Sequence, residues 1–305
     1  MTRSNVGTTI ERIRRQLESN VRLETNVVAA NIDMTQTVIT MMYDIVDALR
    51  PGTVLSIGTE LFRVITVNTG SKEVTVRRAF QDSPASVHQT GDEVLISPRF
   101  TRMDIYDAII AEIDSWTPEL FRVGGYEWTV SDDDDIVELP VELADAIGVI
   151  ALRRQWSDDD RTTWPTIDHR LMRGRVGTWS GATASGLLIR LLPNLGQPRN
   201  GTIYAELALP FDVSSGTLLE SEDLVSDYEL DRSMLEVVEL GVKIRLMGDS
   251  EHGRSGRDTQ DEPRRAEEVP AGSALTVAQT LRQTYARRRG DEQRRLQSKY
   301  KLRSW

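Results

Sequence analysis

The sequence predicts an α+β fold in which a small β-barrel is followed by a helix, a β-sandwich-like region, a further helix and an extended helical C-terminal arm. Three observations indicate this class. Residues 53–96 hold several short β-favouring runs, residues 101–116 carry a helical apolar stripe, and residues 273–301 are polar and rich in helix formers. The expected segments are an N-terminal helix at 1–24, the barrel at 25–100, a core of helices and β region at 101–247, and a linker with a basic arm at 248–305.

Composition limits the classes of protein to which the chain can belong. Its 305 residues are enough for two or three domains. Because it has no cysteine, it has no disulfide, thiolate zinc site or cysteine nucleophile. No apolar run approaches the roughly 18 residues of a membrane span, and residues 1–20 lack the apolar core of a signal peptide. We therefore expect no membrane partner and synthesis in a cytosol.

The first fifth of the chain predicts a helix and then strands. Thr8 and Glu11 have the spacing of a capping box, so we expect a helix over residues 8–19. Residues 27–42 are rich in Thr, Val and Ile, which favour strands. Residues 41–49 fit either a strand end or a helical turn before the break at Pro51-Gly52.

Short runs separated by turns predict the barrel. Asn68-Thr69-Gly70 supplies a turn in which Asn or Gly adopts a positive φ. Four to six short strands within about 70 residues are typical of a small barrel. The expected strands here are 54–57, 61–67, 74–80 and 94–96.

Residues 101–116 form the clearest predicted helix. Thr101 and Asp104 have capping-box spacing at its start, and Pro118 follows its end. The apolar positions recur at intervals of three and four residues, which places them on one face. That stripe consists of Tyr106, Ile109, Ile110 and Ile113.

The chain then returns to β structure before a last helical region. Strands are expected at 121–130, 136–139, 146–155, 187–192 and 202–209, and this spacing is typical of a β-sandwich. A helix is expected at 233–247. Residues 248–272 have almost no apolar content and predict a linker. Two helices, 273–289 and 291–301, are expected to be broken at Gly290.

Charge is distributed unevenly along the chain. Residues 264–305 hold eleven Lys and Arg and four Asp and Glu, so their net charge is +7. The whole chain has a net charge of −10, so the other 263 residues together carry −17. A basic tail on an acidic body is typical of a chain that grips an acidic partner.

No catalytic, cofactor-binding or metal-binding residues are predicted. The runs Asp132–Asp135 and Asp158–Asp160 are interpreted as acidic loops, because the ligand spacing of a calcium-binding EF-hand is absent. The Gly-rich stretch 174–186 lacks the P-loop pattern and is expected to be a loop. The three histidines, His88, His169 and His252, lack metal-ligand spacing, and His88 is expected to hold a barrel loop. Trp156, Trp164 and Trp179 are expected to pack in a core or interface rather than stack on a sugar or base.

Residues 53–116 also follow a recognisable order. Glu60 precedes a hydrophobic strand, Arg77-Arg78-Ala79-Phe80 closes another, His88 and Gly91 follow, and Pro98-Arg99-Phe100 opens the helix. In this order the chain resembles the head-to-tail adaptor (connector) proteins of tailed bacteriophages, over roughly residues 25–247. It departs at Ala79, where that family often has Gly, and at Asp82-Ser83, where Gly-Thr is usual.

The resemblance implies a structural virion protein of the phage neck, assembled in the host cytoplasm, with no enzyme activity and no cofactor. The implied assembly is a ring of twelve identical subunits that joins the portal protein to downstream neck or tail proteins. Double-stranded DNA would pass through this ring. The acidic body suits a conduit, because DNA affinity rises steeply with each phosphate that Lys or Arg neutralises.

The basic arm is the candidate partner-binding site. Apolar residues precede and follow its arginines, as a docking helix requires and a DNA-binding tail rarely does. Docking onto an acidic portal surface is therefore favoured over DNA contact or a solvated helix face. The candidate residues are Arg282, Tyr285, Arg287, Arg288, Arg289, Arg294, Arg295, Leu296, Lys299, Tyr300 and Trp305.

Two other functions stay open at this point. Another tail or baseplate protein that reuses the same β module would form a ring of different symmetry and would not contact the portal. A hydrolase using the clustered aspartates is the enzyme alternative. Against it, the chain has no G-x-S-x-G motif, P-loop or zinc signature.

Overall fold

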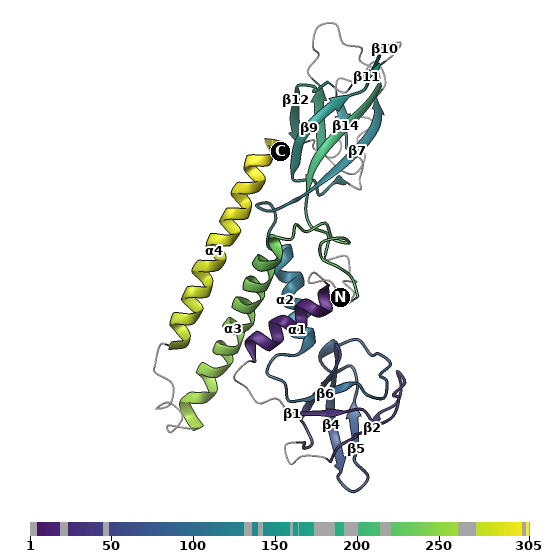
Figure 1. Ribbon diagram of the computed structural model, residues 1–305, viewed down its shortest axis with the longest axis vertical. Helices are drawn as coiled ribbons and strands as arrows, with labels where there is room; N and C mark the ends of the chain where they lie inside the picture. Colours follow the sequence, from purple (N-terminus) through teal and green to yellow (C-terminus); the bar gives the residue numbers. More distant parts are fainter. Residues whose placement is uncertain are drawn as a thin grey trace. The chain divides into compact units, whose positions relative to one another are not determined.

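A computed structural model of the chain describes residues 5–18, 24–44, 49–130, 136–139, 143–158, 161–163, 165–173, 187–191, 201–213, 221–261, 273–300 and 303–304. These residues form a mixed α+β structure with four α helices and antiparallel sheets (Figure 1). The predicted α+β class is confirmed. The helices are α1 (Val6–Leu17), α2 (Arg102–Asp114), α3 (Met234–Asp261) and α4 (Ser273–Lys299).

The chain divides into two compact units, each assembled from separate stretches of sequence. The first unit comprises Met1–Glu112, Leu219–Asp223 and Val238–Arg282. The second comprises Ile113–Leu218, Leu224–Val237 and Gln283–Trp305. The boundaries between the units fall inside α2, α3 and α4.

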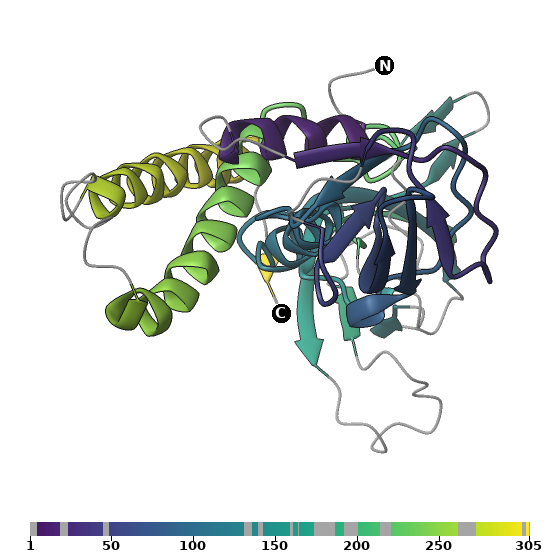
Figure 2. The same ribbon diagram turned by 90° about the horizontal axis from the view of Figure 1, so that it is seen from below.

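A curled six-stranded sheet is the centre of the first unit. Its strand order is β1-β6-β3-β4-β5-β2, and every pairing is antiparallel. A bridge between Val28 and Met41 joins the two edges at one end, so that the sheet curls into a half-barrel (Figures 1 and 2). Its strands are β1 (Glu24–Val27), β2 (Val38–Thr40), β3 (Val54–Ile57), β4 (Glu60–Asn68), β5 (Glu73–Arg77) and β6 (Glu93–Ile96).

Apolar side chains fill the inside of this half-barrel, and most of the predicted strands are in place. Phe62, Leu55 and Val76 belong to its buried cluster. The strand expected to reach residue 80 ends at Arg77 instead, and a 3-10 turn, η1 (Phe80–Asp82), follows. Ala79, Gln81 and Asp82 all have positive φ, which a strand cannot contain.

Helix ends follow their capping residues. In α2, the backbone N–H of Asp104 donates to Thr101 Oγ1 at 3.0 Å, and that of Thr101 donates to Asp104 Oδ2 at 2.8 Å, as the capping box predicted. The prediction for α1 was wrong by two residues. Asn5 caps the helix by accepting from the Thr8 N–H at 3.2 Å, because a free Asn side chain is a better cap than a Thr already inside the first turn.

The second unit contains two further antiparallel sheets. One has the order β15-β9-β14-β7, the other β12-β13-β8, and β10 and β11 form a hairpin. Residues from both sheets, including Leu207 and Ile189, share one buried apolar cluster. The strands are β7 (Arg122–Val130), β8 (Ile136–Glu138), β9 (Gly148–Arg154), β10 (Trp156–Asp158), β11 (Arg161–Thr163), β12 (His169–Arg173), β13 (Leu187–Leu191), β14 (Gly201–Leu209) and β15 (Arg303–Ser304).

Both C-terminal helices are longer than predicted. The helix expected to stop at residue 247 continues to Asp261, so the first half of the expected linker is helical; residues 262–272 lie outside the described part. The expected break at Gly290 is absent, and α4 is continuous. A single Gly costs a helix only about 1 kcal/mol. The pairs Arg294–Asp291 and Arg295–Glu292 span one turn just after it.

Candidate functional site

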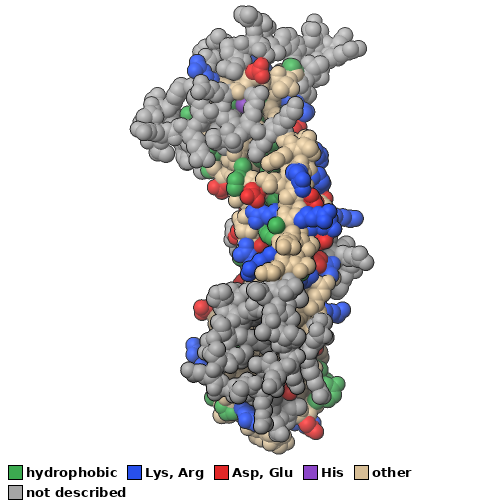
Figure 3. All heavy atoms as spheres, turned by 90° about the vertical axis from the view of Figure 1, so that its left-hand side faces the viewer, with side chains coloured by type: hydrophobic (Ala, Val, Ile, Leu, Met, Phe, Trp, Pro, Cys, Tyr) green, Lys and Arg blue, Asp and Glu red, His purple; other side chains and the backbone are tan. Residues whose placement is uncertain are grey.

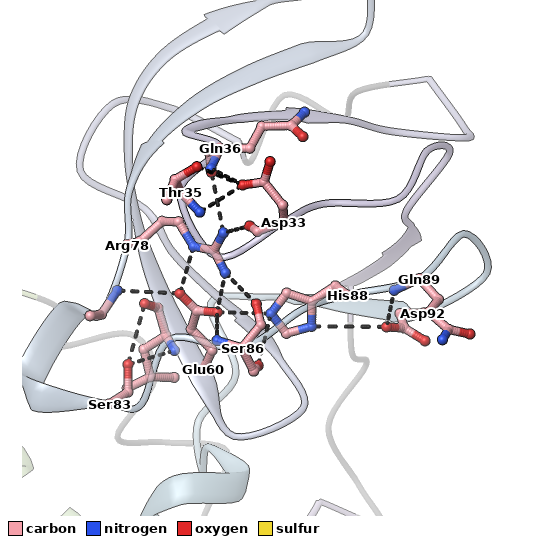
Figure 4. Close-up of polar contacts among 12 residues, drawn as sticks. Asp33, Thr35, Gln36, Glu60, Arg78, Ser83, Ser86, His88, Gln89 and Asp92 are labelled. Atoms are coloured by element: carbon pink, nitrogen blue, oxygen red, sulfur yellow. Dashed lines mark hydrogen bonds and ion pairs between the residues drawn. The ribbon is translucent and has the colours of Figure 1, made fainter.

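Three residues of the adaptor-like order, Glu60, Arg78 and His88, meet in the first unit (Figure 4). Glu60 begins β4, Arg78 follows β5, and His88 lies in the loop before β6. An antiparallel bridge between Ile32 and His88 fixes that loop against the segment between β1 and β2. The antiparallel pairing of β4 with β5 places the start of β4 beside the end of β5, so that Glu60 and Arg78 come together. The expectation that His88 holds a barrel loop is confirmed.

Glu60 is the centre of this cluster. Its side chain is fully buried, and Arg78 donates to it in a bidentate manner, Nε to Oε1 at 2.9 Å and Nη2 to Oε2 at 2.7 Å. The Ser86 N–H and His88 Nε2 each lie 2.9 Å from Oε2. Burial opposes ionisation of this carboxyl, but the hydrogen bonds from Arg78, Ser86 and His88 outweigh burial and lower its pKa below the ordinary value.

The Arg78 guanidinium also connects the loops around the cluster. Nη1 donates to the backbone carbonyls of Asp33 and Gln36, and Nη2 to that of Ser86. Its Cζ lies 5.4 Å from the centroid of the Phe62 ring. Both carboxylate oxygens of Glu60 accept hydrogen bonds from donors inside the fold. The arrangement therefore favours a role in holding loops rather than in chemistry on a substrate.

The predicted docking residues lie on α4 and just after it, and the part of α4 from Gln283 onward belongs to the second unit. Arg289 Nη2 pairs with Glu119 at 3.0 Å, and Arg295 Nη2 with Asp231 at 2.7 Å. The hydrogen bond from Arg295 lowers the pKa of Asp231. Arg288 pairs with Glu236 at 3.3 Å. Three of the predicted arginines therefore already form ion pairs within the chain.

The predicted apolar anchors of the arm, Leu296 and Tyr300, also pack within the chain. Leu296 is buried, the ring of Tyr300 lies 6.4 Å from that of Phe121, and Lys299 Nζ lies 4.9 Å above the Tyr300 ring. The Tyr285 hydroxyl accepts from Arg289 at 3.0 Å. A cavity of about 240 Å³ is lined by Leu296, Lys299 and Tyr300 and by the start of β7. Trp305 lies outside the described residues.

The remaining predicted arginines face outward. Arg282 and Arg287 are exposed and form no ion pair with another described residue, and Arg294 pairs only with its neighbour Asp291 among the residues described. The side of the molecule that carries α4 shows Lys and Arg side chains with Asp and Glu between them (Figure 3). These outward arginines are the part of the predicted docking surface that is accessible.

Sequence reasoning missed the acceptors of the arm. Asp231 and Glu236 come from one stretch of the second unit and Glu119 from another, and no spacing in the sequence signals that they meet one helix. The pairing of Glu60 with Arg78 was also missed. Its signal was a charged residue at the end of each of two apolar strands, where an isolated buried charge would be costly.

Several other predicted features lie outside the described residues: Asp132–Asp135, Asp159, Asp160, Trp164, Trp179 and the Gly-rich stretch 174–186. Within the described part, no three His, Asp or Glu side chains are grouped closely enough to hold a metal ion. No helix in that part combines the length and the hydropathy of a membrane-spanning helix.

A scan of the chain against models of known protein families gives no match, and a search of curated proteins finds no relative.

Proposed function

We propose that the chain is a structural virion protein of a tailed bacteriophage, a head-to-tail adaptor whose ring joins the capsid portal to the tail and forms part of the DNA conduit. One observation carries the proposal. Three residues of the adaptor-like order, Glu60, Arg78 and His88, hold one buried cluster. A sequence order that serves to fix a β module is typical of an assembly part.

The charge distribution supports the same role. Outside residues 264–305 the chain carries a net charge of −17, and an acidic conduit wall repels phosphate so that a duplex can slide. The ring is proposed to contain twelve copies, as the resemblance implies. The small β-barrel and β-sandwich-like region of the adaptor architecture are part of this proposal.

Docking to the portal is assigned to the outward face of α4. Arg287 and Arg294 lie seven residues apart, two turns along the same exposed side of the helix. The partner surface should be acidic, because exposed arginines recognise carboxylates and raise association rates through long-range attraction.

The mass of the purified assembly, alone and mixed with its portal protein, tests the proposal. A ring of twelve that binds the portal is expected. A stable monomer that does not bind the portal contradicts the proposal. A ring of another symmetry that does not bind the portal supports the tail or baseplate alternative instead.

The double variant Arg287→Glu/Arg294→Glu tests the docking face. It should keep the ring and weaken portal binding, with a reduced dependence of binding on salt. Arg232→Glu is the matched control, because Arg232 is exposed outside α4. Equal effects of both variants would exclude α4 as the docking face.

A further inference from the structure

The second unit carries a surface that fits the C-terminal residues 283–304, here called the arm. This arm-binding surface consists of the carboxylates of Glu119, Asp231 and Glu236, the ring of Phe121, and the edge of β9. The carboxylates face three arginines of α4, and β15 pairs with β9 through Arg303–Val149 and Ser304–Gly148. Charge, aromatic contact and strand pairing therefore all match along one segment.

The contacts that hold the arm are few, and most of them are exposed to solvent. Arg288 and Glu236 are each about half exposed, at 52% and 51%, and exposed ion pairs contribute little to stability because water screens them. Of the arm's described side chains, only Leu296 is buried. β15 pairs over two residues. The arm is therefore held mainly by partly exposed ion pairs and a short strand pairing rather than by an apolar core of its own.

The arm is also incompletely covered where it lies. Most side chains of α4 between residues 279 and 299 are exposed, and the helix is polar around most of its circumference. A helix of this kind typically bridges between larger bodies rather than packing into one core. Its outward side is left for a second contact.

We propose that in the assembled ring each subunit places its arm on the arm-binding surface of the neighbouring copy, so that the arms are exchanged around the ring. This inference rests on the proposed function, because it requires a ring. A neighbouring copy carries the same carboxylates, aromatic ring and strand edge, so every contact described above is kept after exchange. Exchange from each subunit to the next closes on itself, so no arm-binding surface stays empty.

The occupant is therefore a second copy of this chain, and its chemistry is known from the chain itself. Arg295 of one subunit would pair with the Asp231 carboxylate of the next, and Leu296 and Tyr300 would lie beside the neighbouring Phe121. The outward Arg287 and Arg294 stay accessible in this arrangement, so arm exchange and portal docking use different sides of the same helix.

Cysteine pairs test the exchange without background, because the chain has no cysteine of its own. The double variant Asp231→Cys/Arg295→Cys is assembled, its mass is measured, and it is then treated with a bis-maleimide cross-linker that contains a reducible disulfide, because the lengths of the Arg and Asp side chains leave the two positions too far apart for a direct disulfide. Exchange predicts a ladder of covalently linked multimers on a non-reducing denaturing gel, which collapses to monomer after reduction. Internally linked monomers obtained from an intact ring would overturn the exchange and leave the proposed function standing.

Two further experiments make the result decisive. The pair Glu236→Cys/Arg288→Cys repeats the test at the other ion pair, and Asp231→Cys/Arg294→Cys is the matched control, because Arg294 faces away from the surface. Mixing Asp231→Arg chains with Arg295→Asp chains should give rings that recover stability against dilution relative to rings of either variant alone, since opposite charges again meet across each exchanged contact of a mixed ring. No recovery on mixing contradicts exchange. Failure of the unaltered chain to form a ring contradicts the proposed function instead.

Discussion

Glu60 and Arg78 form a bidentate ion pair inside the curled sheet of the first unit, with Nε–Oε1 and Nη2–Oε2 distances of 2.9 and 2.7 Å. Both side chains are shielded from solvent, at 0% and 7% exposed. The pair joins the start of β4 to the end of β5 and anchors the loops that carry Asp33 and Ser86. The stability of the curled sheet should therefore depend on this pair and on its surroundings.

Replacing Arg78 with Met should lower the free energy of unfolding by about 3–5 kcal/mol, because Glu60 would stay buried without its main partner. Chemical denaturation of the full chain measures this. Arg77→Met is the matched control, since Arg77 is exposed and makes no ion pair with another described residue. It should change the free energy of unfolding by less than about 0.5 kcal/mol. Equal losses in both variants would contradict a special role for the buried pair.

Stability should fall in acid because of Glu60. Its pKa is lowered in the folded state, so its ionised form contributes stability above the ordinary pKa of 4.5. That contribution is lost progressively as the pH falls below 4.5 through the folded-state pKa. Denaturation midpoints between about pH 7 and pH 3 measure the loss. Glu60→Gln should be less stable at neutral pH and show a shallower dependence over this range, and an unchanged slope would contradict the assignment.

Ala79→Gly should stabilise the protein by about 1 kcal/mol, because Ala79 has a left-handed conformation that is costly for a residue with a Cβ and free of that cost for Gly. Its φ is 49° and its ψ is 41°. The hydrogen bond from its backbone N–H to Glu60 is unchanged by the substitution. Ala85→Gly is the control, because Ala85 is exposed and has no positive φ. It should destabilise slightly through the unfolded state, so the two changes in melting temperature should have opposite signs.

Gly241→Ala should destabilise the first unit by about 1–3 kcal/mol, because the added Cβ would overlap a buried side chain. A Cβ at Gly241 of α3 would lie 2.2–2.6 Å from the carboxylate atoms of Glu112 on α2, which is buried and paired with Arg245 at 2.8 Å. Gly290→Ala in α4 meets no atom within 4 Å. It should stabilise the helix by about 0.5–1 kcal/mol, because Ala is the better helix former. Thermal unfolding and helical circular dichroism compare the two, and a loss in both would exclude the steric explanation.

Local patterns predicted most elements of the fold. The strand at 54–57 and the helix after Thr101 followed from turn residues, alternation and a capping box that act within a few residues. The prediction missed the end of β5, because Ala79 has a positive φ that the preference of Ala does not indicate. It also broke α4 at Gly290, where local propensity is too weak to overcome the turns on either side.

The sequence by itself determined the α+β class, the short strands of the curled sheet and the basic character of the C-terminal residues, because each depends on residue type and spacing along the chain. Only the tertiary structure decided which charges meet. Glu60, Arg78 and His88 converge through the antiparallel pairing of β4 with β5 and the bridge at His88. Arg288 and Arg295 are held by Glu236 and Asp231 from one stretch, and Arg289 by Glu119 from another. Long-range pairing has no local signal, since a charge alone does not specify its partner.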